Sequence, residues 1–69
     1  MNKISVGIPT FNSSKYLSYC LKSLSKLTSI DEIIISDDGS TDDEYKKIEQ
    51  IVREFKFNND IELLKNKMN

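Results

Sequence analysis

Residues Ile33–Ile35 form a continuous run of β-branched apolar side chains between two segments with helical periodicity. Such a run predicts a buried strand of a parallel sheet, covered on both faces. On either side of it, apolar residues recur at spacings of three and four, which is the helical period. The first helix would bury Leu17, Cys20, Leu21, Leu24 and Leu27, and the second Tyr45, Ile48, Ile51, Val52 and Phe55. This alternation of strand and helix predicts an α/β fold.

Two further strands are predicted at the ends of the chain. Ile4–Ile8 forms the first, and Pro9 ends it because proline cannot donate to a sheet ladder. Ile61–Leu64 forms the third, after a turn at residues 58–60. Residues 65–69 are predicted to be a tail without an element of its own.

Hydroxyl side chains mark the start of both predicted helices. The first helix can be capped by Ser13 or Ser14, since a side-chain oxygen at that position accepts a bond from a free backbone N–H. The second helix is expected to begin near Ser40 or Thr41. Two pairs there fit the register of a capping box, namely Ser40 with Asp43 and Thr41 with Glu44.

The predicted elements together make a βαβαβ unit. Crossovers between parallel strands are right-handed in almost all cases, so a strand order of 3-2-1 places both helices on one face. The result is a Rossmann-like half sheet with a bare second face and an open edge at its first strand. Such a unit is half of a doubly wound sheet. We therefore expect the N-terminal piece of a longer protein, or association with copies of itself through the bare face or that edge.

The composition excludes several classes of function. Ten basic and eleven acidic residues give a net charge of -1, whereas a surface for nucleic acid or anionic membrane needs a basic excess. One cysteine and no histidine exclude an intrachain disulfide and a zinc site built from Cys and His. No apolar run reaches transmembrane length, and the N-terminus lacks the apolar core of a signal peptide. We expect a cytoplasmic protein of one domain.

Two polar loops follow the first and second strands, at the sheet edge where open α/β sheets bind ligands. Adjacent parallel strands lie about 4.8 Å apart, so Pro9–Asn12 and Asp37–Ser40 can share one pocket. The glycine-rich phosphate motifs are absent, and the calcium-loop pattern does not fit. A carboxylate instead suits a ring N–H, such as N3 of uracil or N1 of guanine, and repels the bare N3 of cytosine. Phe11 could add a stacking wall, and the first helix offers free N–H groups.

Structural roles remain open for the same residues. Asp37 could accept backbone N–H bonds within the turn, and Gly39 is expected to adopt a positive φ there. Asn12 could stabilise its loop through backbone hydrogen bonds rather than contact a ligand. Phe11 could serve only in packing.

The residues around both loops resemble the start of family 2 glycosyltransferases, which have the GT-A fold. Members of that family typically have a first strand ending in Pro-Thr-Tyr/Phe-Asn and a second ending in Asp-Asp-Gly-Ser-Thr-Asp. The matching motifs here are Pro9-Thr10-Phe11-Asn12 and Asp37 to Asp42, with Tyr16-Leu17 and Ser23-Leu24 between them. The resemblance covers nearly the whole chain.

The resemblance implies transfer of a sugar from a nucleotide-diphosphate sugar, often a UDP-sugar, to an acceptor hydroxyl. In such enzymes the carboxylate that matches Asp38 binds the uracil N–H, and the one that matches Asp37 is more structural. Thr10 and Phe11 match positions that contact the nucleoside. The predicted nucleotide-binding residues are therefore Pro9, Thr10, Phe11, Asn12, Asp37 and Asp38.

The chain also departs from the family pattern. Family members hold the diphosphate through a divalent metal, Mg or Mn, on a D-x-D motif, and this sequence contains no D-x-D. The catalytic Asp or Glu of the family has no counterpart either, so we expect no catalytic or metal-binding residue and no cofactor in residues 1–69. The expectation is one truncated nucleotide-sugar-binding subdomain, inactive alone. The alternative is a small non-enzymatic α/β module that self-associates through its bare sheet face.

Overall fold

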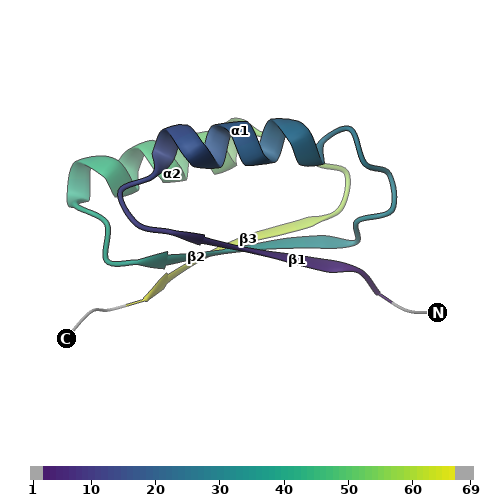
Figure 1. Cartoon of the computed structure of the whole chain (residues 1–69), viewed down its shortest axis with the longest axis horizontal. Helices are drawn as coiled ribbons and strands as arrows, with labels where there is room; N and C mark the ends of the chain where they lie inside the picture. Colours follow the sequence, from purple (N-terminus) through teal and green to yellow (C-terminus); the bar gives the residue numbers. More distant parts are fainter. Residues whose placement is uncertain (1–2, 67–69) are drawn as a thin grey trace.

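The computed structural model describes residues 3–66, in which three strands alternate with two helices. In chain order the elements are β1 (Ser5–Thr10), α1 (Ser14–Leu24), β2 (Glu32–Asp38), α2 (Asp42–Glu54) and β3 (Asp60–Asn66). The strands are all parallel and form one sheet in the order β1-β2-β3, and both helices lie over the same face of it (Figure 1). The predicted α/β half sheet, with strand order 3-2-1 and helices on one face, is confirmed.

The core lies between the sheet and the two helices. It consists of the buried apolar side chains Ile8, Leu17, Leu21, Ile30, Ile33, Ile35 and Ile48. Successive residues of a strand point to opposite faces, so Ile33 and Ile35 are fully buried beneath the helices, whereas Ile34 on the other face is only half-buried. The prediction that this strand is covered on both faces is wrong, because both crossovers place their helices on the same side.

The helices bury the residues that their periodicity predicts, with one exception. Leu17 and Leu21 of α1 and Ile48 of α2 are almost completely buried. Partly buried residues pack around them, namely Cys20, Leu24, Ile51, Val52 and Phe55. Leu27 was predicted on the same face but is 54% exposed, because α1 ends at Leu24. Neither helix in residues 3–66 has the length and apolar character needed to cross a membrane.

The strands continue further than predicted. Pro9 lies within β1, opposite Ser36, rather than ending the strand. An edge strand tolerates proline because some of its N–H groups point away from the ladder. The third strand was predicted to stop before Lys65, but β3 runs from Asp60 through Asn66, since β2 offers a partner along this whole length. The rest of the predicted tail lies outside the described residues.

Candidate functional site

Asp37 joins the two loops that follow β1 and β2. Its side chain is fully buried and accepts hydrogen bonds from Thr10 Oγ1 at 2.7 Å, from the Ser40 backbone N–H at 3.0 Å and from the Ser40 hydroxyl. Asp37 and Thr10 are opposite each other in the β1–β2 register and lie on the helix-covered face. Asp37 therefore holds the end of β1 against the turn after β2.

The surroundings of Asp37 favour its charged form. Burial by itself would raise the pKa of this carboxyl, because a low-dielectric site disfavours charge. The hydrogen bonds from Ser40 and Thr10 outweigh burial, so the pKa of Asp37 lies below its ordinary value. Within the described residues every buried side-chain nitrogen and oxygen has a hydrogen-bond partner. The buried polar groups of Asp37, Thr10 and Ser40 are therefore all hydrogen-bonded within the protein, which indicates a structural role.

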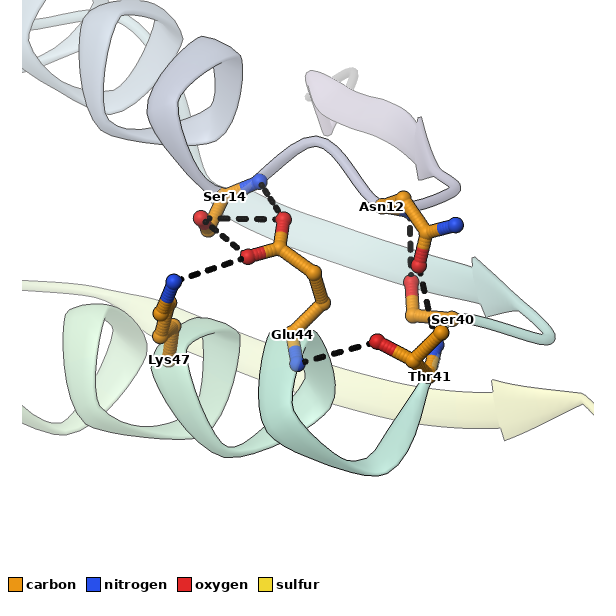
Figure 2. A network of polar contacts seen from close by, with 6 residues as sticks. All are labelled: Asn12, Ser14, Ser40, Thr41, Glu44 and Lys47. Carbon is orange, nitrogen blue, oxygen red and sulfur yellow. Dashed lines mark hydrogen bonds and ion pairs between the residues drawn. The ribbon is translucent and has the colours of Figure 1, made fainter.

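Asn12 connects the first loop to the start of α2 (Figure 2). Its backbone N–H donates to Ser40 Oγ at 2.8 Å, and its side-chain Oδ1 accepts from the Thr41 N–H at 2.9 Å. Asn12 has a φ of 48°, in the left-handed region that asparagine enters more readily than most residues. Gly39, with a φ of 89°, has the positive value predicted for the turn. The two loops therefore form one hydrogen-bonded unit.

Glu44 links the first turns of the two helices (Figure 2). Its backbone N–H donates to Thr41 Oγ1 at 3.3 Å, so Thr41 caps α2. Its carboxylate accepts from the Ser14 backbone N–H at 3.2 Å and from the Ser14 hydroxyl, and it pairs with Lys47 Nζ at 3.4 Å. The predicted capping box is only half formed, because the Thr41 N–H donates to Asn12 and the Glu44 carboxylate caps α1 instead.

The carboxylate at the start of α1 changes what that helix end can bind. The hydrogen bond from the Ser14 N–H holds the pKa of Glu44 below its ordinary value, against the opposing effect of burial. A negative charge therefore lies where the helix dipole would otherwise attract an anion. Ser13 occupies the N-cap position, but its hydroxyl accepts from the Phe11 N–H and does not cap the helix. The predicted free N–H groups of this helix do not include that of Ser14.

Glu44→Ala is expected to lower the melting temperature by roughly 4–8 °C, the scale of one lost helix cap. The reason is that Ser14 loses its acceptor and the two helices lose a shared contact. Glu44→Gln should recover part of the loss, since the amide oxygen still accepts. Thermal unfolding followed by circular dichroism measures both variants. Glu49→Ala, at an exposed position of the same helix, is the control, and an equal shift there would contradict this role of Glu44.

Phe11 and Asp38 present accessible side chains at the carboxyl edge of the sheet. Phe11 is 57% exposed in the first loop, and Asp38 is exposed at the end of β2. Pro9 is exposed in β1, on the face opposite to the helices. The structure thus divides the predicted site residues, because Thr10 and Asp37 are buried and hold the loops together.

Asn66 is a neighbour of Asp38 that sequence reasoning missed. Its side-chain Nδ2 donates to Asp38 Oδ1 at 2.9 Å from the end of β3. The predicted third strand stopped at Leu64, which left Asn66 in a tail without an assigned position. Continuing the parallel pairing by two residues would have placed Asn66 opposite Asp38, as the β2–β3 register shows.

A metal site is not found within residues 3–66, where no cluster of three or more His, Cys, Asp or Glu side chains could hold an ion.

A cavity of about 500 Å³ lies between β1 and α1, away from Asp38. It is lined by Val6, Gly7, Ile8, Pro9, Tyr16, Tyr19, Cys20, Ser23 and Leu24. None of these side chains carries a carboxylate, so the charged acceptor proposed for a ring N–H lies at the loops rather than in this cavity.

Two comparisons with known proteins gave a match. The family model described as Glycosyl transferase family 2 matches residues 5–69. A chondroitin synthase from Escherichia coli is 42% identical over 48 residues, which cover 68% of this chain and 7% of that protein. The match thus spans only a small part of the length of this curated relative. No solved structure gave a significant match.

Proposed function

The chain belongs to glycosyl transferase family 2, and from that premise we propose that it binds the nucleoside of a nucleotide-sugar donor, with UDP as the nucleotide. The observation that carries the proposal is the position of Asp38. This exposed carboxylate lies at the carboxyl edge of a parallel sheet, where such sheets bind ligands, and the neighbouring loop carries the exposed aromatic side chain of Phe11.

The chemistry of Asp38 favours a base with a ring N–H. A carboxylate oxygen only accepts hydrogen bonds, so it can accept from N3–H of uracil but meets a lone pair on N3 of cytosine or N1 of adenine. Phe11 offers a face on which a base can stack, a contact of about 1–3 kcal/mol per base in nucleic-acid complexes. Guanine also has a ring N–H, and the family resemblance favours uracil over it.

Hydrogen bonds within the protein fix the positions of both loops. Asp37, Thr10 and Asn12 hold the loops through hydrogen bonds within the protein. Their proposed role is to position Phe11 and Asp38, rather than to touch the base. A site that is already ordered loses less conformational entropy on binding, which favours affinity.

We do not assign the transfer step itself to residues 3–66. The divalent metal that family members use to hold the diphosphate finds no ligand cluster here. Carboxylates such as Asp38 and Glu44 repel phosphate unless a cation intervenes. We therefore assign only nucleoside binding to these residues, and expect no sugar transfer by the 69-residue chain alone.

Isothermal titration of the chain with UDP, CDP and ADP tests the proposal. UDP should bind at least about tenfold more tightly than the other two, because among these three bases only uracil has a ring N–H that can donate to Asp38 in a charge-assisted hydrogen bond. The three nucleotides share the diphosphate, so the difference reports on the base. Equal affinities for all three would overturn the base-reading site.

Self-association remains the competing function. Ser5–Thr10 forms an edge strand without a charged side chain, and natural edge strands are usually protected by charge. Charge on the bare sheet face opposes self-association through it. Asp38 and Glu62 would bring like charges together between two copies, whereas the charge of Glu32 is already paired with Lys3 Nζ at 3.5 Å. Sedimentation of the titration samples distinguishes nucleoside binding from self-association. An oligomer whose stability does not change when UDP is added would favour self-association.

A further inference from the structure

Asn66 and Asp38 form a side-chain pair at the carboxyl edge of the sheet. They are opposite each other in the parallel β2–β3 register, on the face away from the helices. Asn66 Nδ2 donates to Asp38 Oδ1 at 2.9 Å. Because a carboxylate oxygen only accepts, this contact orients the amide with its nitrogen towards Asp38.

The contact leaves one hydrogen-bonding group of each side chain for a ligand. Among the hydrogen bonds between described residues, Asp38 Oδ1 is occupied, whereas Asp38 Oδ2 is not. An amide nitrogen carries two hydrogens, and the contact with Asp38 uses one of them. The pair therefore presents an acceptor on Asp38 beside a donor on Asn66, and both side chains are exposed.

We propose that Asn66 is a specificity-determining residue that reads the base together with Asp38, an inference that rests on the nucleoside-binding function proposed above. Uracil carries the ring N3–H next to the carbonyl at C4. The N–H donates to Asp38 Oδ2, and the neighbouring carbonyl accepts the second amide hydrogen of Asn66. The edge of the base and the edge of the side-chain pair are therefore complementary at two adjacent positions.

Cytosine presents the opposite pattern at both positions. Its bare ring nitrogen meets the Asp38 acceptor, and its amino group meets the Asn66 donor. Guanine has a carbonyl beside its N1–H, so the pair alone would also accept it. The inference is therefore tested on the ratio of UDP to CDP affinity, with GDP measured alongside.

Asn66→Ala should weaken UDP binding by roughly 2- to 12-fold, the range expected for one neutral hydrogen bond. Asn66→Asp should lower the ratio of UDP to CDP affinity by about tenfold, because an acceptor now faces the uracil carbonyl and suits the cytosine amino group. Glu62→Gln, on the same exposed face of β3, is the matched control and should leave the ratio unchanged. Titration calorimetry gives the affinities, and circular dichroism confirms that each variant is folded.

The role of Asn66 can also be tested without a substitution, by NMR of the unaltered chain. In the unaltered chain its side-chain amide proton resonances should shift on addition of UDP and shift less on addition of CDP. Unchanged resonances at saturating UDP would overturn the inference, as would Asn66→Asp with the original ratio. If Asp38→Ala removes the preference for UDP over CDP while the Asn66 variants retain it, the proposed role of Asn66 is wrong and the proposed function still stands. If the unaltered chain shows no UDP preference, the proposed function fails with it.

Discussion

Replacing Asp37 by alanine is expected to lower the free energy of unfolding by about 3–5 kcal/mol. The change removes a buried acceptor and leaves the Ser40 N–H, the Ser40 hydroxyl and the Thr10 hydroxyl without their partner. Each buried donor that loses its acceptor costs roughly 1–3 kcal/mol. Because a domain of this size has only roughly 3–10 kcal/mol of stability, much of the variant should be unfolded at room temperature.

Urea unfolding followed by circular dichroism measures the effect of Asp37→Ala. Asp42→Ala is the matched control, because Asp42 is an acid at the exposed start of α2 in the same segment. Its loss should cost no more than about 1 kcal/mol, the scale of a favourable interaction with a helix dipole. Equal destabilisation by the two substitutions would contradict the bracing role of Asp37.

The same carboxylate makes stability depend on pH. Since the pKa of Asp37 in the folded chain lies below its ordinary value of 3.8, the unfolded chain binds this proton more readily than the folded chain does. Its stabilisation is therefore complete above about pH 4 and is lost as the pH falls through the folded pKa. Asp37→Asn should flatten this acid part of the stability curve, which urea unfolding at a series of pH values would show.

Asp38→Ala is expected to weaken UDP binding by about 10- to 150-fold, the range for a hydrogen bond to a charged group. Asp38 is exposed, and its one side-chain hydrogen bond among the described residues is with Asn66, so the melting temperature should change little. Asp38→Asn should have an intermediate effect, because an amide oxygen accepts without the charge. Titration calorimetry with UDP and CDP measures these changes.

Asp43→Ala controls for the general loss of a negative charge near the loops. Asp43 is exposed in the first turn of α2 and should leave UDP affinity close to that of the unaltered chain. If Asp38→Ala left UDP affinity intact, Asp38 would have no part in the site. If it reduced UDP and CDP affinity equally, the carboxylate would act through charge and would not read the base.

The helices and the order of the strands were predictable because they depend on local patterns and on general rules of chain topology. The spacing of Leu17, Leu21 and Ile48 identified the faces that are buried. Right-handed crossovers, taken together with the strand order 3-2-1, then led to the single helix layer. The bounds were less accurate at Pro9 and Asn66, because a strand continues for as long as its neighbour offers a pairing partner.

The candidate site was predictable only in part. The adjacent carboxylates after an apolar run placed Asp37 and Asp38 at the carboxyl edge of the sheet. Their different environments follow from the alternation of side chains along a strand, which turns Asp37 towards the helices and Asp38 away from them. Burial then makes one a brace for the loops, while exposure leaves the other available to a ligand.

The sequence by itself determined the elements, their order and the two loops, because periodicity and turn residues act over a few neighbouring positions. Only the tertiary structure decided which distant groups meet. Glu44 fits the capping box of its own helix, yet its carboxylate caps α1, 30 residues away in the chain. Asn66 likewise meets Asp38 across 28 residues. Side-chain partners of this kind depend on how the strands align and how the loops close, and no local pattern contains that information.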